Sequence, residues 1–461
     1  MTDTPDAIEA FADHVVSTPF EALPEEAVAA AKVFLLDSLG VGLAGTRAPY
    51  VDEWIAGHRA AAAGPGARIW GIGGSLPTPA AAAVNGYLIH NSEYDCVHEG
   101  AVLHPMATLL PAVMAGAEAR AETGAPVSGR ALLRALILGV DVSTSIGNAV
   151  TTGLTFFRPA TAGGFGAVAA LGVAAELDRA RLLDAFGLYY AQAGGTMQAH
   201  TEGLALLAMQ AGFCSRNAVV ALHMAEQGIA GTRGTLEGPF GFLRLMEEAY
   251  DRDALLGGLG RVWRITEVAH KPFPSGRATH GLVDGFADLK AEHGFSADAI
   301  ERVDASVPPL THRLIGRPVM AGMKVNYARL SGPYTAARVL LTGTLGLDDF
   351  SDAALTDPAT LDLGARITVT ADANPDPNAF APVAVAVILK DGRRLERTVD
   401  TVYGSPAKPM TREAHLEKFR RNVAHARGDL PADAADRLIA LVDGLERVED
   451  VRTLLDPMVS A

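Results

Sequence analysis

Apolar residues recur every three or four positions through the first part of the chain, which is the period of a helix with a buried face. Proline fits the first turn of a helix, so Pro24 and Pro79 mark helix starts, and the hydroxyl of Thr78 can cap the second of them. The pattern predicts helices over 7–18, 24–43, 79–97, 105–121, 129–150, 160–176, 180–193, 207–227 and 239–249.

After residue 267 short segments with the period of a β-strand alternate with helices. Asp391-Gly392 stands between two of these segments and is a strong hairpin signal. We predict strands over 302–307, 366–371, 383–389 and 394–399, helices over 278–293 and 330–342 between them, and closing helices over 411–426, 431–444 and 447–455. The fold class is therefore mostly α, with a smaller α+β unit at 268–405 between the long helical part and the closing helices.

Composition narrows the class of protein. The chain has 461 residues, of which 49% are hydrophobic and 20% charged, and its net charge of −14 argues against nucleic acid and acidic membranes as partners. Charged residues or glycine interrupt the long apolar stretches, so we expect no membrane span. The acidic N-terminus lacks the features of a secretion signal, and the two cysteines, Cys96 and Cys214, fit a reducing compartment, so we expect a cytoplasmic protein.

Titratable side chains gather between His90 and His104, in a sequence otherwise rich in alanine, leucine and glycine. On the predicted helix 79–97 and its continuation, Asn91, Asp95 and His98 share one face. His104 precedes Pro105 at the positive end of the next helix, where an anionic substrate would be stabilised.

A second polar cluster lies at 269–280, where two prolines and a glycine predict a rigid loop. Lys271, Arg277 and His280 on this loop can bind a carboxylate and transfer protons.

Structural interpretations stay open for each of these side chains. His104 and His280 can be ordinary helix-start residues, Tyr334 a core residue, and the acidic cluster a solvated helix face formed by Glu93, Asp95 and His98. Asp95, His98 and His104 are also possible zinc or manganese ligands of a metallohydrolase, although the spacing differs from the His-Glu-x-x-His motif.

Ordered motifs along nearly the whole chain resemble the MmgE/PrpD superfamily, which includes 2-methylcitrate dehydratase, cis-aconitate decarboxylase and iminodisuccinate epimerase. Each motif is weak alone, and the ordered set carries the resemblance: Leu35–Gly40 and Leu43–Gly45; Asn85–Gly86, His90, Glu93–Asp95, His98 and His104–Pro105; Phe165–Ala167; Glu202–Gly203 and Gln210–Gly212; Lys271–Pro274, Arg277 and His280; Pro333–Tyr334; and Gly404–Pro406, Pro409 and Lys418–Phe419.

The resemblance implies a helical domain built from both chain ends, 1–267 plus 406–461, with the α+β domain at 268–405 as a lid and the active site between them. It also implies a homodimer that needs no cofactor and no metal. The family's reactions break or form bonds next to a carboxylate, by loss of water, loss of CO2 or inversion at a carbon, so we expect a small anionic substrate.

Residue roles follow from the same resemblance. Glu93 and Asp95 match the acidic motif, although many members have aspartate at Glu93, and Cys96 replaces a second aspartate. His98 resembles a histidine of an epimerase-like subgroup, while His104 and His280 match the helix-start and lid histidines. The remaining expected substrate-binding residues are Lys271, Arg277, His200 and Tyr334.

Two positions depart from the family pattern. Leu207 stands where many members have a lysine after the Glu-Gly motif, and Phe157, or Arg158 in a shifted alignment, replaces a histidine. These changes remove positive charge, which disfavours a tricarboxylate substrate.

We therefore expect proton abstraction next to a carboxylate or carbonyl, with His104 and His280 on opposite faces of the reacting carbon. Glu93 and Asp95 would orient the histidines His98 or His104, and the basic lid residues would stabilise the enolate. Epimerisation or isomerisation is slightly preferred to dehydration, and decarboxylation is the least favoured reaction. A non-catalytic helical dimer that binds a ligand is the remaining alternative.

Overall fold

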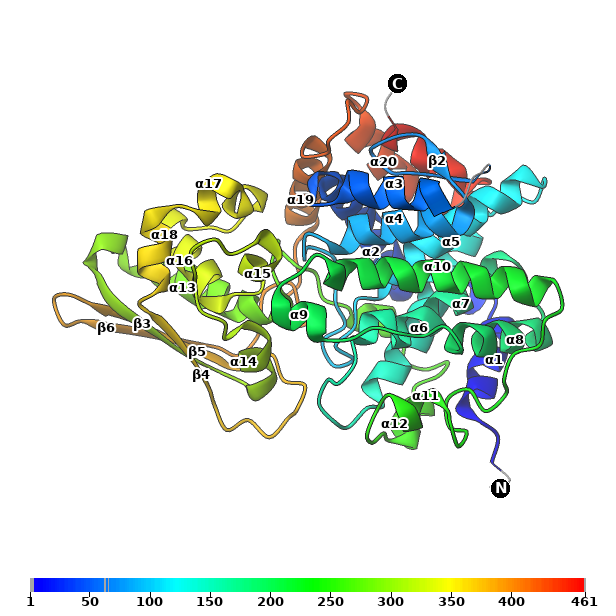
Figure 1. The fold of residues 1–461 in the computed structure, drawn as a ribbon, viewed down its shortest axis with the longest axis horizontal. Coiled ribbons are helices and arrows are strands. Elements are labelled where there is room, and N and C mark those ends of the chain that lie inside the picture. The colour runs from blue at the N-terminus through cyan, green and yellow to red at the C-terminus, as the bar shows by residue number, and fades with distance from the viewer. Residues whose placement is uncertain (1–3, 62–63, 65, 460–461) are drawn as a thin grey trace.

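A large helical domain forms one side of the molecule in the computed structural model, which describes residues 4–61, 64 and 66–459 (Figure 1). Its N-terminal part comprises α1 (Ala7–Ser17), α2 (Glu25–Ala44), α3 (Val51–Ala61), α4 (Thr78–His90), α5 (Pro105–Glu122), α6 (Gly129–Asn148), α7 (Ala162–Ala174), α8 (Arg179–Tyr190), α9 (Gln198–Glu202), α10 (Leu206–Glu226), α11 (Phe242–Leu245) and α12 (Arg252–Leu256), with short strands β1 (Ala67–Arg68) and β2 (Ser75–Leu76).

The C-terminal end of the chain returns to this domain. Helix α19 (Arg412–Ala424) and helix α20 (Ala434–Asp443) pack against α2, and 3-10 turns over Val451–Met458 follow. Figure 1 shows both helices, in orange and red, beside the blue N-terminal helices. The helical domain is therefore built from both ends of the chain, although residues 1–3, 62–63, 65 and 460–461 of its predicted extent lie outside the described residues.

The lid is a mixed four-stranded sheet covered by helices. Its elements are α13 (His280–His293), β3 (Ile300–Val307), α14 (Pro309–Ile315), α15 (Val325–Arg329), α16 (Gly332–Thr342), α17 (Asp352–Leu355), α18 (Pro358–Gly364), β4 (Ile367–Ala371), β5 (Val383–Leu389) and β6 (Arg394–Val399). The strand order is β4-β3-β5-β6, with β3 parallel to β4 and antiparallel to β5. Helix α13 packs against β5 and β6, and α16 against β4.

Two separate hydrophobic cores underlie the two parts. Val268 belongs to the helical core and Ala278 to the lid core, so the chain crosses between them over this short segment. It crosses back between Val402 and Phe419. The mostly helical class with a smaller α+β part is thus confirmed.

Close packing fixes the helix that leads into the site. Helix α4 lies against α10, where a Cβ added to Gly212 would come within 2.2 Å of the carbonyl oxygen of Ala83. Only glycine permits this approach, which holds the middle of α4 against α10 in the core.

The prediction of one helix over 79–97 is wrong at its C-terminal end. Helix α4 begins at Thr78 rather than after it and ends at His90. Beyond it, Val97 pairs with Ala269 through two backbone hydrogen bonds of 2.8 and 3.0 Å. Backbone pairing with a segment far along the chain outweighs local helical periodicity, so Asn91, Asp95 and His98 do not share a helix face.

Two shorter predictions also change. The segment predicted as a helix at 239–249 contains only the four-residue helix α11. The last predicted helix, 447–455, is a run of 3-10 turns over Val451–Met458 that contains Pro457, which cannot donate a helical hydrogen bond.

Two helical segments, Glu25–Arg47 and Gly129–Asn148, are long and apolar enough to cross a membrane by length and composition alone, although charged residues and glycine interrupt both. However, 72% and 83% of their most apolar parts are buried inside the molecule. Core helices meet the same criterion, and their burial here accounts for their composition.

Candidate functional site at the domain junction

The pairing of Val97 with Ala269 brings the two polar clusters of the sequence together. Glu93 lies two residues before Asp95 on the first segment, and Lys271 lies two residues after Ala269 on the second. The ammonium of Lys271 donates a 2.8 Å hydrogen bond to Oε2 of Glu93 and lies 3.9 Å from Oδ1 of Asp95. A single buried group of charges therefore spans both parts of the molecule.

Asp95 lies between two histidines. Its carboxylate is fully buried, with Oδ2 at 3.1 Å from Nδ1 of His90 and 3.1 Å from Nδ1 of His104. A carboxylate only accepts hydrogen bonds, so each Nδ1 donates to it. In the neutral form of His104 the other nitrogen, Nε2, then carries a lone pair and can act as a base.

These neighbours shift the pKa values in opposite directions. Burial lowers the pKa of His104 below its usual 6.5, although Asp95 opposes the shift. Burial acts in the same direction on His90, but there the Asp95 carboxylate prevails and the pKa rises. Burial alone would raise the pKa of Asp95, yet the two histidines and Lys271 hold it well below its usual range. The arrangement favours a neutral His104 beside a protonated His90.

Glu93 is ionised for a similar reason. Burial would raise its pKa, but the adjacent ammonium of Lys271 outweighs this effect and lowers the pKa to about 2. Because Lys271 is fully buried and Glu93 separates it from the cavity, its charge is already balanced within the protein.

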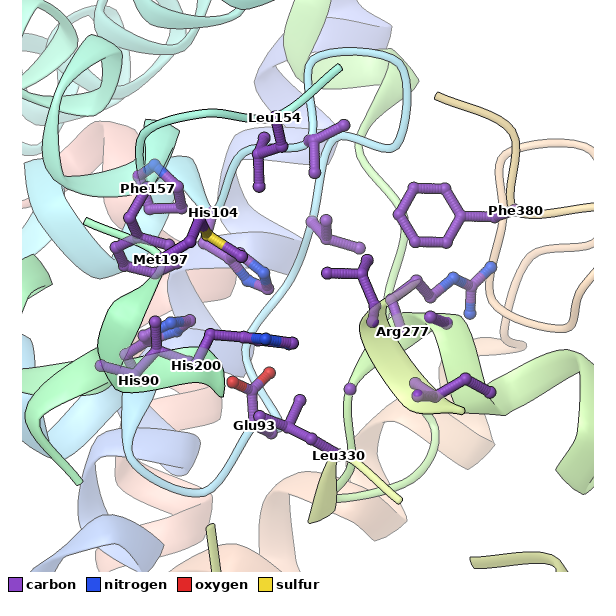
Figure 2. A pocket seen from close by; sticks show the side chains of 18 residues that line it. His90, Glu93, His104, Leu154, Phe157, Met197, His200, Arg277, Leu330 and Phe380 are labelled. Carbon is purple, nitrogen blue, oxygen red and sulfur yellow. The ribbon is translucent and has the colours of Figure 1, made fainter. Parts of the chain in front are cut away.

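A cavity of about 70 Å³ opens beside these groups, between the helical domain and the lid. Figure 2 shows the side chains of Glu93, His104 and His200 directed towards the same space. Most of its lining is apolar, and the full lining comprises His90, Glu93, Val97, Val102, His104, Leu154, Phe157, Pro159, Met197, His200, Leu207, Gly276, Arg277, Ala278, Leu314, Ile315, Leu330 and Phe380.

Arg277 lines the cavity mainly through its stem, because its guanidinium already has partners. Nε donates to Glu99 at 2.6 Å, and Nη1 donates to the carbonyl oxygen of Tyr403 at 2.7 Å. Figure 2 shows the guanidinium directed away from His104.

His280 is not among the cavity residues, contrary to the expectation that it faces His104 across the substrate. It is fully buried, and both ring nitrogens are engaged: Nδ1 accepts from Nη1 of Arg277 at 3.3 Å, and Nε2 donates to the carbonyl oxygen of Ser275 at 3.2 Å. The tight loop before α13 turns the ring inward, where it contacts Phe273. In this geometry His280 supports Arg277 instead of reaching a reacting carbon.

Two more predicted residues lie away from the cavity. His98 pairs with Glu267 at 3.1 Å and not with Asp95, because the chain leaves the helix after His90. Tyr334 is fully buried in the lid core and donates its hydroxyl hydrogen to the carbonyl oxygen of Asp349 at 2.6 Å. Its predicted substrate contact is absent from this geometry.

His200 lies at the cavity, as expected of a substrate-binding residue, and has a partner that the sequence did not reveal. Nη2 of Arg317 donates to Nδ1 of His200 at 3.2 Å and to its carbonyl oxygen at 3.0 Å. Two other contributors were also missed, His90 and the buried Arg329, whose charge acts on Glu93. A histidine five residues before an aspartate was a usable signal, whereas nothing local marks either arginine.

The alternative metal site is not assembled as predicted, because His98 lies apart from Asp95 and His104. His90, Asp95 and His104 do place nitrogen and oxygen atoms within 4.8 Å of one another, as do Asp37, His270 and His415. In the first cluster histidine hydrogen bonds satisfy the carboxylate. In the second, Lys418 lies 2.7 Å from Asp37, and its positive charge opposes a bound cation.

Comparison with known proteins gives matches along nearly the whole chain. The MmgE/PrpD N-terminal domain model matches residues 9–254, and the MmgE/PrpD C-terminal domain model matches residues 273–447. The chain is 26% identical over 467 residues to cis-aconitate decarboxylase of Aspergillus terreus, covering 94% of this chain and 92% of that protein. It is 27% identical to the cis-aconitate decarboxylases of Mus musculus and Homo sapiens, over 97% of this chain and 92% and 93% of theirs.

Proposed function

The chain belongs to the MmgE/PrpD family, and on this premise we propose that it is a lyase that breaks a bond next to the carboxylate of a small acid. The full-length similarity to cis-aconitate decarboxylases supports lyase chemistry. The observation that carries the proposal is the hydrogen bond of 3.1 Å between Asp95 and His104 at the edge of the cavity.

His104 transfers the proton in this proposal. Asp95 holds Nδ1–H, so Nε2 can take a proton from the carbon next to the carboxylate while the C–H electron pair moves into an enolate. The protonated His90 lies on the same carboxylate, with its ring centroid 4.6 Å from that of His104. In a dehydration it can protonate the departing hydroxyl, and the enolate electron pair then forms the new double bond as water leaves. In a decarboxylation the electron pair of the breaking C–CO2 bond moves to that carbon, which takes a proton from His90.

His90 and His104 are both held by the carboxylate of Asp95, and this shared position favours bond breaking over inversion. Inversion needs a proton donor on the opposite face of the carbon, and His280 does not line the cavity. Epimerisation therefore needs a donor other than the one expected, whereas loss of CO2 or water can use His90 and His104 from one side. Loss of CO2 or water is thus preferred to epimerisation, whereas the sequence slightly favoured epimerisation or isomerisation. The homodimer and the cytoplasmic location stay predictions.

Product analysis tests this proposal. The purified protein is incubated with hydroxylated and unsaturated acids that carry one, two or three carboxylates, and products are followed by proton NMR and by CO2 release. We expect a product that has lost CO2 or water. Inversion with no bond loss would overturn the lyase assignment in favour of an epimerase, and an absence of turnover over the whole panel would contradict both.

The pH dependence of kcat/KM should have two limbs. His104 must be neutral, and its lowered pKa keeps it so to a pH below 6.5, so the acid limb should fall below 6.5. His90 must be protonated, and its raised pKa places the alkaline limb above 6.5. Because His90 and His104 share Asp95, each limb reports a pKa of the coupled pair of histidines and not of one residue alone. An acid limb at or above pH 6.5 would contradict the assignment, and thermal melts at each pH control for unfolding.

A further inference from the structure

The cavity has an apolar wall beside His104 (Figure 2). Leu154, Phe157, Met197 and Leu207 come from the helical domain, and Phe380 comes from the lid. Figure 2 shows Leu154, Phe157 and Met197 on the same side as His104. Binding is stabilised by about 25 cal/mol per Å² of apolar surface removed from water, and this wall provides that stabilisation only when an apolar group of the ligand covers it.

Positive charge at the cavity is largely compensated. Among the described residues that line it, Arg277 is the only permanent cation, and Glu99 and backbone carbonyl groups already bind its guanidinium. Lys271 is paired with Glu93 behind the cavity surface. The protonated His90 also lines the cavity, but the Asp95 carboxylate balances its charge. A second or third substrate carboxylate would therefore lie in largely apolar surroundings with no uncompensated cation to replace its water, which is strongly unfavourable.

Nε2 of His90 also lacks a partner at the cavity, but it serves the proton transfer. Apart from it, Nε2 of His200 can accept a substrate carboxylate as its hydrogen-bond partner. Because Arg317 donates to Nδ1 of His200, the ring hydrogen of neutral His200 lies on Nε2. That Nε2 is buried at the cavity and has no partner in the described structure. Burial and then the charge of Arg317 lower the pKa of His200 to about 4, so the ring is a neutral donor backed by a guanidinium. A donor without an acceptor fits one carboxylate oxygen.

We infer that the substrate is a small acid with a single carboxylate and a short apolar substituent. The carboxylate accepts a hydrogen bond from Nε2 of His200, and the substituent packs against Leu154, Phe157, Met197 and Leu207. This inference rests on the proposed function for the identity of the site, and it adds the chemical class of the substrate.

Binding can be measured apart from turnover, by calorimetry on the His104→Gln variant. The probes share one six-carbon skeleton and differ in carboxylates: 2-ethylbut-2-enoate has one, 2-ethylbut-2-enedioate has two and prop-1-ene-1,2,3-tricarboxylate has three. We expect the monocarboxylate to bind at least about tenfold more tightly than the others, since tenfold corresponds to only about 1.4 kcal/mol. Equal or tighter binding of the di- or tricarboxylate would overturn the inference.

Leu207→Lys adds a cation to the apolar wall and should reverse the order in favour of the dicarboxylate. The matched control is Leu206→Lys, because Leu206 is the next residue on α10 and is 46% exposed. If Leu207→Lys fails to fold, Leu207→Ala should weaken monocarboxylate binding by about fivefold, because the substituent then buries less apolar surface. No change in Leu207→Ala would also overturn the inference.

Different results would contradict the lyase assignment and the inferred substrate class. A monocarboxylate that binds in the expected order but is never turned over by the unchanged protein would contradict the lyase assignment and leave the substrate class standing. Turnover confined to tricarboxylates would contradict the substrate class and leave the lyase assignment standing.

Discussion

Replacement of His104 by glutamine should lower kcat by a factor on the order of 10²–10⁴, the usual contribution of a positioned general base. Glutamine can keep the hydrogen bond to Asp95, but its side chain has no basic nitrogen to accept a proton from carbon. The fold should persist, because the side chain of His104 is 13% exposed and lies at the cavity edge. Steady-state kinetics with the identified substrate gives the comparison.

His223→Gln is the matched control, because His223 lies on the exposed side of α10. That variant should keep the activity of the unchanged protein. Near-normal turnover in His104→Gln would show that another group moves the proton, and the central role of the Asp95–His104 pair would then be lost.

Replacement of Lys271 by methionine should lower the free energy of unfolding by about 3–5 kcal/mol, the cost of leaving one member of a buried ion pair without its partner. Lys271 is fully buried, and the side chain of Glu93 is only 9% exposed. Its carboxylate would lose its closest cation and keep only the more distant charges. Denaturant unfolding of the two proteins measures the difference.

A double variant separates charge from packing. Lys271→Met combined with Glu93→Gln removes both charges and should recover a large part of the loss. Arg427→Met is the control for an exposed pair: Arg427 and Asp52 are 2.8 Å apart on the surface, so this change should cost about 1 kcal/mol or less. Equal losses in the single and double variants would mean that the pair contributes through shape alone.

The sequence predicted the elements with long, regular periodicity. Helices α5, α6, α7 and α10 and the hairpin of β5 and β6 lie within a few residues of the predicted positions. The end of α4 was wrong because the next residues pair with Ala269, and local periodicity holds no information on such a distant partner. A resemblance to a family supplied the architecture that periodicity alone could not.

The site could be predicted only in part, because a local pattern holds no information on contacts with distant segments. Residue chemistry singled out Glu93, Asp95, His104 and Lys271, and the structure gathers them at one junction. Residue chemistry did not reveal the direction in which each side chain points. His280 is adjacent in sequence to residues at the cavity, yet its ring turns into the lid.

The role of His90 depends on its distance from Asp95 after the helix ends, which only the fold determines. The same is true of Arg317, which lies 117 residues from His200 and fixes its tautomer. Both contacts form between segments that no local pattern links.

The most direct test of the central claim is deuterium incorporation. The unchanged protein and the His104→Gln variant are incubated side by side in D2O with the substrate found by product analysis, and proton NMR follows the carbon where a proton is transferred. We expect deuterium at that carbon of the recovered substrate or of the product with the unchanged protein, and little or none with His104→Gln. Equal incorporation by the two proteins would contradict the assignment of His104 as the base.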